Sequence, residues 1–550
     1  MATLGTGSFT SSPLHLGSDG GLVAAFTNAY LNIMQELISY ETPGHAVFGQ
    51  KGNLVEWGKG VTATFPTRKP ARRGIVGDVS NRQGRIPRGG SPTYALAEFE
   101  AMTHRLAINF DWNAMNTASN ERYVANLVKN ALSDVKEQWN RRQNIWLYSG
   151  ELSNPDRVSV NSVATVFSNA SKNVIGDGCV AVVSGTAASG QADVKVRLPI
   201  SQGEAVAGEL TENDTVQSGA QWLEPGDYIS LVSLTTGNGE YAQISSITRS
   251  YESINSGAAN ASASGSDGFA TLTLTGNLVN TYASYTWSGA AAAEASDAGT
   301  VIHLASPAAA ADLGAIAQGD LQDSDICGAY PGFGSITGPM HRNKSTDNSG
   351  NGVRDYLGAS NDQYWSSEVL NFDSFNSGAA TGNNVLNLDF LVLDRMLHQI
   401  NALHHRRPDC LFMNPQVWME WVSEANVGHA FRNAGSLTPS PGGDGTNAGV
   451  GADVNLTYKS IQAVTGVGTL DVIVDPYCPA YTMYAVNKGD VGYMERFPMT
   501  MATDDGSEFR FPAEAKDQLE AFLRVVSTFV ALHPAAVNKI TGIRQETPIL

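Results

Sequence analysis

The sequence predicts an α+β fold divided into several domains, and three observations lead to this prediction. Residues 119–150 repeat apolar side chains with the period of a helix. Residues 53–65 and 105–112 alternate apolar and polar side chains with the period of a strand. Residues 151–320 are rich in Ser, Thr, Ala, Gly and Val and break into short β-like runs. Helical and strand-like patterns therefore occupy separate stretches of the chain, as in α+β proteins.

The helical segment is long and has signals at both ends. Ser119 is a candidate N-cap, and Gly150 suits a left-handed C-cap. Arg141 and Arg142 lie near the negative end of the helix dipole. At about 1.5 Å per residue the helix would be about 45 Å long, so we expect a strut with an elongated body beside it. Its apolar residues are Tyr123, Val124, Leu127, Val128, Ala131, Leu132, Val135, Trp139, Ile145 and Trp146.

Composition places the chain among globular proteins. Of its 550 residues, 42% are apolar and 16% are charged, which is enough apolar material for a large core and for roughly two to four domains. The four cysteines are far apart and form no CxxC pair, so we expect reduced thiols rather than disulfides or a zinc knuckle. No basic stretch precedes Lys51, and no apolar run reaches the about 18 residues of a membrane span. We therefore expect a soluble protein made in the cytoplasm.

Charge is distributed unevenly along the chain, whose net charge is -18. Residues 51–90 contain nine Lys or Arg and two acidic residues, whereas residues 201–330 contain fifteen acidic residues and one base, Arg249. Complementary basic and acidic segments in one chain favour head-to-tail association of identical copies. Because phosphates repel an acidic region, residues 201–330 should face away from any nucleic acid that the protein touches.

The basic residues gather in a loop near the N-terminal end. Residues 1–20 form an arm without periodicity, and residues 22–39 predict an amphipathic packing helix. Residues 53–65 then predict one half-buried strand, and the loop at 66–93 follows. We interpret this loop as an arm that docks on a neighbouring subunit; a flexible solvated loop comes second and a nucleic-acid arm third, since no aromatic residue is available for base stacking. Its candidate contact residues are Arg68, Lys69, Arg72, Arg73, Arg82, Arg85 and Arg88.

The remainder of the chain predicts a β-rich module followed by mixed α and β structure. Within 151–320 the runs 180–183, 228–234 and 270–274 predict strands separated by turns. Asn387 is expected to cap an amphipathic helix that ends near His404, and Asn414-Pro415 predicts the start of another. Residues 472–474 and 481–486 predict buried strands. The long apolar run 518–532 is interpreted as a strand, with a helix as the open alternative.

Motifs for catalysis are weak throughout the chain. The GFGSITG stretch at 332–338 misses the dinucleotide fingerprint, and no GxxxxGKS loop or GxSxG elbow occurs. His398 and His404 are about 240° apart around a helix, so they do not share a face with which to bind a metal. The loop that starts at Asp347 resembles a calcium loop, but Gly358 stands where a glutamate is needed. We therefore predict a protein that is not an enzyme and has neither cofactor nor metal.

The order of these parts resembles the major capsid proteins of tailed bacteriophages that have the HK97 fold. An N-terminal arm and helix, a long basic loop between strands, a strut helix, an α/β domain and a closing apolar strand before Pro534-Ala535-Ala536-Val537 carry the resemblance. It implies an N-terminal arm and helix (1–50), an E-loop (51–112), the spine helix of a P-domain (113–150), a β-rich acidic insertion domain (151–327), an A-domain (328–505) and the C-terminal part of the P-domain (506–550).

The resemblance also implies a function. Copies would assemble as hexamers and pentamers into an icosahedral shell around double-stranded phage DNA, in the virion capsid after assembly in the host cytoplasm. Portal proteins, scaffolding proteins and decoration proteins would be further partners, and no membrane would be involved. Some relatives cross-link a loop lysine to a neighbour, for which Lys59 and Lys69 are available. The alternative is a virion surface or tail protein whose β-rich module binds a receptor or carbohydrate.

Overall fold

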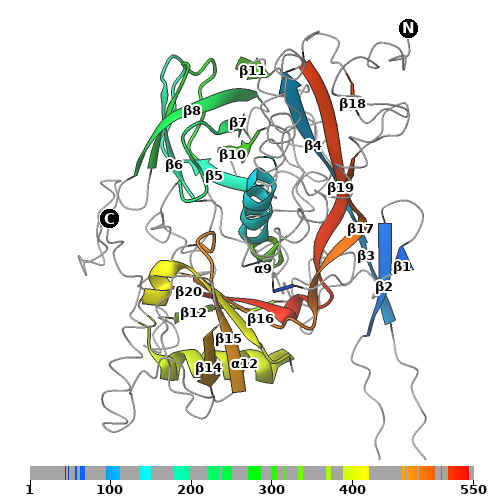
Figure 1. Ribbon diagram of the computed structural model, residues 1–550. Coiled ribbons are helices and arrows are strands. Elements are labelled where there is room, and N and C mark those ends of the chain that lie inside the picture. Colours follow the sequence, from blue (N-terminus) through cyan, green and yellow to red (C-terminus); the bar gives the residue numbers. More distant parts are fainter. Residues whose placement is uncertain are drawn as a thin grey trace, which may run out of the picture.

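In the residues that it describes, the computed structural model has four β-sheets arranged around one central helix (Figure 1). This combination of separate sheets and helices agrees with the α+β class. None of the helices in the described part of the chain is both long and apolar enough to cross a membrane. The structure describes residues 44, 47–48, 56–57, 62–68, 94–111, 135, 137–149, 178–198, 220–233, 238–249, 270–285, 299–305, 314–316, 332–337, 367–372, 388–404, 406–419, 421, 461–465, 468–479, 482–501, 509–510 and 518–543.

The smallest sheet is a three-stranded arm built from β1 (Glu56–Trp57), β2 (Thr62–Arg68) and β3 (Tyr94–Glu100). All of its pairings are antiparallel, with Glu56 opposite Thr64. The single strand predicted for residues 53–65 is therefore wrong, because the chain reverses between β1 and β2. Period-two alternation is the same in two antiparallel strands as in one continuous strand, so the pattern alone does not reveal the reversal.

The second sheet is long and narrow, and β19 (Gln518–Ala531) is its spine. β4 (Met102–Asp111) pairs with one edge of β19, and β17 (Val491–Met501) and β18 (Phe509–Arg510) pair with the other. The strand predicted for residues 518–532 is confirmed and the helix alternative is excluded. At about 3.3 Å per residue, the 14 residues of β19 span about 46 Å, so this sheet sets the long dimension of the body. We call it the elongated sheet.

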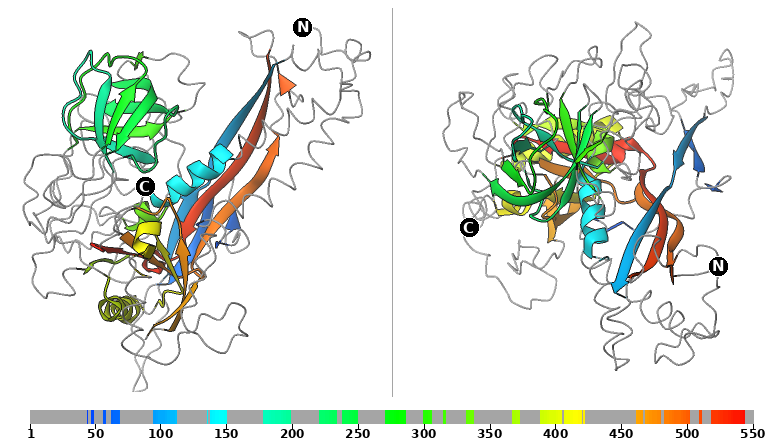
Figure 2. Two further views of the ribbon diagram at one scale, coloured as in Figure 1. Left: turned by 60° about the vertical axis from the view of Figure 1, so that its left-hand side comes forward. Right: turned by 90° about the horizontal axis from the view of Figure 1, so that it is seen from above.

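The central helix lies beside the elongated sheet and is described over residues 137–148 (Figure 2). Trp139, Ile145 and Trp146, which the sequence places on the apolar stripe of this helix, are all buried. The earlier part of the predicted helix, from Ser119, and its C-cap Gly150 lie outside the described residues. The helix therefore separates the elongated sheet from the seven-stranded sheet on its other side.

The seven-stranded sheet is entirely antiparallel and closes on itself. Its order is β11-β8-β7-β10-β5-β6-β9, and the long strand β8 pairs with β7 through its first half and with β9 through its second half. Closure hides strand edges that would otherwise be open to pairing with other chains. The strands are β5 (Cys179–Val183), β6 (Asp193–Arg197), β7 (Tyr228–Ser233), β8 (Gly239–Arg249), β9 (Ala270–Leu274), β10 (Thr300–Leu304) and β11 (Gly314–Ile316).

The fourth sheet has six strands in the order β12-β20-β16-β13-β15-β14 and is mixed. β12–β20 and β13–β15 are parallel, and the other pairs are antiparallel. It packs against α12 (Phe390–His404), whose Val392, Leu393, Met396, Leu397 and Ile400 are buried. The strands are β12 (Val369–Asn371), β13 (Cys410–Met413), β14 (Ile461–Thr465), β15 (Gly468–Val474), β16 (Thr482–Val486) and β20 (Val537–Thr541).

The two helix starts in this region differ in how well the sequence predicts them. Asn414 Oδ1 accepts a hydrogen bond from the backbone N–H of Gln416 at 3.0 Å, which confirms Asn414 as an N-cap. For α12 the capping oxygen belongs to Asp389, which accepts from the N–H of Leu391 at 2.7 Å. The expected cap, Asn387, precedes the helix by three residues and is not the capping residue. Either residue type can cap a helix, so geometry decides between them.

The chain crosses twice between the six-stranded sheet and the elongated sheet. β16 leads into β17, and β19 leads through a short 3-10 turn (Pro534–Ala536) into β20. The expected boundary at residue 505/506 therefore does not coincide with a change of sheet, because β17 belongs with β19 and β20 belongs with β16. Two connections between the same two sheets fix their relative position, since backbone hydrogen bonds join one connection to the other.

Candidate functional site: the junction around the central helix

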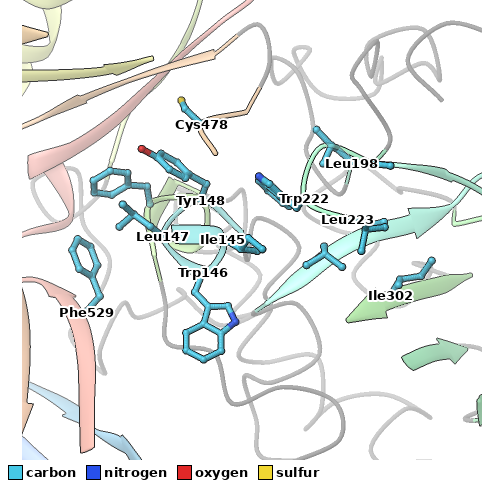
Figure 3. Packing of buried hydrophobic residues seen from close by; sticks show 14 of the residues in the cluster. Ile145, Trp146, Leu147, Tyr148, Leu198, Trp222, Leu223, Ile302, Cys478 and Phe529 are labelled. Carbon is cyan, nitrogen blue, oxygen red and sulfur yellow. The ribbon is translucent and has the colours of Figure 1, made fainter. Parts of the chain in front are cut away.

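Six aromatic rings meet where the helix and the sheets converge, and each ring comes from a different element. The ring of Phe333 lies at the centre, with its centroid 5.2–5.8 Å from those of the five others. Each such pair stabilises the fold by about 0.5–1.5 kcal/mol beyond the burial of its apolar area. Figure 3 shows Tyr148 and Phe529 on one side of the helix end, opposite Trp222 and Ile302. The six residues are Phe48, Tyr148, Phe333, Phe412, Tyr484 and Phe529.

Two glycines allow the short helix α9 (Phe333–Thr337) to contact the backbone of the central helix. A Cβ on Gly332 would lie 2.2 Å from the carbonyl oxygen of Trp146, and one on Gly334 would lie 2.2 Å from that of Tyr148. Both distances are shorter than van der Waals contact allows, so only glycine fits at these positions. The glycines of the GFGSITG stretch thus have a packing role in this fold.

A charged contact joins the seven-stranded sheet to the central helix. The guanidinium of Arg141 donates two hydrogen bonds to the carboxylate of Asp227, at 2.8 and 2.7 Å, and a third to the carbonyl of Trp222 at 2.9 Å. Arg142 donates to the carbonyl of Ala305 at 2.8 Å. A bidentate arginine–carboxylate pair fixes orientation as well as distance. These two arginines therefore anchor the module to the helix, besides lying near the negative end of its dipole.

A second contact joins the same module to the six-stranded sheet. The indole N–H of Trp222 donates to the carbonyl of Tyr477 at 2.9 Å, and the amide of Gln221 donates to the carbonyls of Pro476 and Cys478 at 2.9 and 2.7 Å. Trp222 is 1% exposed, so its whole side chain is enclosed. The module is consequently held at two places, on the helix and on the turn after β15.

A buried carboxylate lies at the centre of these contacts. Asp475 has no exposed surface and accepts hydrogen bonds from the hydroxyl of Tyr148 and the backbone N–H of Tyr477, each at 2.9 Å. The backbone N–H of Gly44 is a further donor. Burial raises the pKa of Asp475 to about 6, although these three hydrogen bonds act to lower it. A Cβ at position 44 would lie 2.7 Å from Oδ2, so the N-terminal segment reaches this carboxylate through a glycine.

The helix contacts the elongated sheet through a partly polar layer. The imidazole of His104 on β4 lies between the indoles of Trp139 and Trp146, with both centroid distances 5.0 Å. Burial and the nearby charge of Arg142 lower the pKa of His104 to about 4, so this histidine is neutral at pH 7. Gln143 donates to the hydroxyl of Tyr493 at 3.1 Å, and that hydroxyl donates to Ser527.

Ion pairs and hydrogen bonds hold the turn between β16 and β17. Lys488 pairs with Asp471, and Arg406 pairs with Asp490. The backbone N–H of Asn487 donates to the carbonyl of Ala536 at 2.8 Å, and that of Leu532 donates to the carbonyl of Asp490 at 2.7 Å. The two crossings are thus bonded to each other, which gives a fixed corner between the sheets.

The predicted contact residues of the basic loop are placed only in part. Arg68 is the last residue of β2, at the end of the arm where the loop begins. Lys69, Arg72, Arg73, Arg82, Arg85 and Arg88 lie outside the described residues, as do Lys59 and the N-terminal helix predicted at 22–39. Their role as inter-subunit contacts stays a prediction.

Within the described residues, the chemistry of the junction is that of packing. No group of three or more His, Cys, Asp or Glu side chains there could hold a metal ion. Cys179, Cys410 and Cys478 are free thiols in the core, and burial raises the pKa of Cys179 to about 12. A thiol with a raised pKa is a poor nucleophile, because the thiolate is the reactive form. His398 Nε2 lies 3.7 Å from Oδ2 of Asp394, one turn earlier on α12.

Sequence reasoning missed several residues that build the junction. Trp222 precedes the turn Glu224-Pro225-Gly226-Asp227 by two residues and Asp227 is its last residue, and this pattern predicts only a turn. The sequence feature that could have identified these two residues is a tryptophan beside a proline- and glycine-containing turn, in a region otherwise poor in large side chains. Gly332 and Gly334 carry a signal too, since two glycines one residue apart favour close backbone approach. Asp475 has no such signal, since nothing local distinguishes it from a surface aspartate.

In comparisons with known proteins, the chain is similar to several solved structures. No model of a known protein family matches the chain, and no curated protein sequence is similar to it. The capsid asymmetric unit of cyanophage A-1(L) matches 92% of this chain and 94% of its own length, at 11% identity and a TM-score of 0.36. The procapsid of satellite phage P4 with its size determination protein matches 94% and 91%, at 11% identity and a TM-score of 0.30.

A structure from Mycobacterium phage Ogopogo matches 90% of this chain and 92% of its own length, at 9% identity and a TM-score of 0.31. The chain is thus similar over most of its length to structures from phages, two of which are described as a capsid and a procapsid. All three TM-scores are below 0.5, and none of these likenesses assigns a function by itself.

Proposed function

We propose that this chain is the major capsid protein of a tailed bacteriophage, a structural protein whose copies form hexamers and pentamers in an icosahedral shell around double-stranded DNA. The observation that carries this proposal is the arm β1–β3, which extends from the body and continues directly into β4 of the elongated sheet (Figure 1). An extended arm joined to a packed body suits a protein that binds other copies of itself through the arm.

The arm has backbone groups that a neighbour can satisfy. Its strand order is β1-β2-β3, and within the described residues no strand pairs with the outer edge of β3. An open strand edge is a template for pairing with another chain. The basic loop begins where β2 ends, at Arg68, so the arm also carries positive charge towards a neighbour.

The junction supplies the rigidity that a shell needs. The aromatic cluster around Phe333 and the arginine contacts of the central helix join all of the large sheets to one helix. Close-packed interiors resist deformation, so the body from which the arm extends keeps its shape. Identical subunits that keep one shape can repeat the same contacts around a closed shell.

We expect the remaining parts to follow from this assignment. The β-rich module would be an insertion domain, and the six-stranded sheet would form the A-domain at the centre of a capsomer. The shell would be the capsid of the virion and would contact a portal protein. Scaffolding or decoration proteins would be further partners. This function depends on the shape of the subunit and on its contacts with other copies, and not on a catalysed reaction. A junction built from packed side chains suits such a function.

Electron microscopy and sedimentation of the expressed full-length chain test the proposal. We expect closed shells, or hexamers and pentamers, that sediment far ahead of the 58.3 kDa monomer. Particles that disperse into monomers as salt concentration rises would agree with charge-assisted contacts between subunits. A chain that stays monomeric under every condition would contradict the proposal. Small, discrete oligomers that bind a glycan or receptor would favour the alternative of a surface or tail protein.

A further inference from the structure

Several side chains mark the face of the elongated sheet that is turned away from the central helix. His104 on β4 points to the helix, where it lies between Trp139 and Trp146. Successive side chains of a strand point to opposite faces, so Arg105 points away from the helix. Arg105 lies directly opposite Arg524 of β19 in the antiparallel register, which places both guanidinium groups on this outer face.

The two arginines form an uncompensated pair. Both are exposed, and neither has an ion-pair partner among the residues that the structure describes. Like charges directly opposite each other on adjacent strands destabilise a sheet. Such a pair is therefore expected to be more favourable when an anion lies across both side chains than when the surface is bare.

An exposed aromatic ring extends this patch onto β17. Phe497 is 46% exposed, and the guanidinium carbons of Arg496 and Arg524 lie 5.3 and 6.0 Å from its ring centroid. Cation–π contact orients a guanidinium without neutralising it. Glu495 lies opposite Ser527, and the register shifts between Glu495 and Phe497.

The seven-stranded sheet lies on the far side of the central helix from the elongated sheet (Figure 2). The outer face with Arg105 and Arg524 is therefore turned away from the seven-stranded sheet. A polyanion would be attracted to the exposed guanidinium groups on this face.

We propose that Arg105, Arg496, Phe497 and Arg524 form a surface that binds the phosphate backbone of double-stranded DNA, so that this face of the elongated sheet lines the inside of the shell. The inference rests on the proposed function and adds the orientation of the subunit in the shell. Guanidinium groups match phosphate oxygens in geometry and remain charged at all relevant pH values. The exposed side chains of this patch are two arginines and one aromatic ring, whereas a protein partner would need a larger exposed apolar area.

Salt-dependent DNA binding by the full-length chain tests this surface. A duplex of random sequence is titrated with the unassembled protein at several salt concentrations, and the slope of log K against log salt is compared between variants. The test variant is Arg105→Gln with Arg524→Gln. The matched control is Arg395→Gln, which removes an exposed cation from α12, outside the patch. Circular dichroism verifies that each variant is folded.

We expect the double variant to lower the slope by about 1.8, at about 0.9 for each phosphate that is no longer neutralised, and to bind at least about tenfold more weakly at low salt. Arg395→Gln should leave both values unchanged. An unchanged slope in the double variant, or an equal reduction in the control, overturns the proposal.

Shell assembly of the same variants separates this inference from the proposed function. If the double variant assembles as the wild type does and binds DNA more weakly, both stand. If shells form and DNA affinity is unchanged, only the DNA surface is wrong. If the double variant forms no shells while its DNA affinity is unchanged, the patch is an interface between copies and the proposal is overturned. A wild-type chain that binds DNA through these arginines but never assembles would contradict the capsid function alone.

Discussion

Asp475 shows how a single buried group links the N-terminal segment, the central helix and the six-stranded sheet. It accepts hydrogen bonds from Gly44, Tyr148 and Tyr477, which come from three separate stretches of the chain. Burial nevertheless raises its pKa from 3.8 to about 6, because the charged form loses its hydration. The folded state therefore holds the proton of Asp475 more tightly than the unfolded state does.

We predict a pH dependence that Asp475→Asn removes. A group whose pKa is raised by folding contributes stability that is fully present below the unfolded pKa of 3.8 and is lost as pH rises through about 6. The difference between these values corresponds to about 3 kcal/mol. The free energy of unfolding of the wild type, relative to that of Asp475→Asn, should fall by up to this amount between about pH 4 and pH 8. Denaturant titrations followed by tryptophan fluorescence measure it, and a pH-independent difference would contradict the assignment.

Gly334 contributes through the absence of a side chain. We predict that Gly334→Ala destabilises the fold by about 3 kcal/mol or more, because its Cβ would lie 2.2 Å from the carbonyl oxygen of Tyr148 and neither backbone can move without repacking. Gly276→Ala is the matched control, since a Cβ there meets nothing within 4 Å. Thermal unfolding compares the two variants, and equal melting temperatures would show that α9 yields to the added methyl group.

At the scale of elements, the closed seven-stranded sheet depends on a few contacts for its position. We predict that Arg141→Gln costs about 2–3 kcal/mol, because it removes charge-assisted hydrogen bonds to Asp227 and leaves that carboxylate without its charged partner. Limited proteolysis should then release the module faster than in the wild type. The strands of the module should persist, since their core does not include Arg141.

Glu224→Gln is the control for this contact, because Glu224 lies 3.6 Å from the same guanidinium but its side chain is 63% exposed. An exposed ion pair contributes little, so we expect a change below about 1 kcal/mol and unaltered proteolysis. Equal effects of the two substitutions would mean that charge alone, rather than the bidentate contact, holds the module.

Elements with a long, regular pattern were predictable from the sequence. The apolar stripe of α12 repeats the helical period over 15 residues, so local pattern and tertiary packing agree. The long apolar run that forms the 14 residues of β19 predicted a strand, with a helix as the open alternative. The prediction around β1 failed because an alternating pattern is the same on both sides of a hairpin. The cap of α12 was misplaced because Asn387 and Asp389 offer the same chemistry two residues apart.

At the scale of the whole molecule, the basic loop beyond β2 is the part that we expect to make contacts between copies. We predict that replacing Arg72, Arg73, Arg82 and Arg85 together by Ser leaves the subunit folded but weakens assembly. The difference from the wild type should be largest at low salt and should shrink as salt concentration rises, because salt screens the charged contacts that only the wild type can make. Sedimentation of particles at about 0.05 and 0.3 M salt measures the effect. Arg395→Ser serves as the control for charge outside the loop, and an unchanged particle yield in the quadruple variant would count against the arm.

The sequence by itself determined the properties that depend on local residue patterns and on the composition and charge of each stretch. These are the mixed class, the periods of the long elements, the separation of acidic and basic stretches, and the order of parts that resembles capsid proteins. Tertiary structure alone decided which distant residues meet: Gly44 with Asp475, Arg141 with Asp227, and Arg105 with Arg524. Such pairs are set by strand register and close packing, which act between segments tens to hundreds of residues apart, whereas a sequence pattern carries information only over a few turns of helix or strand.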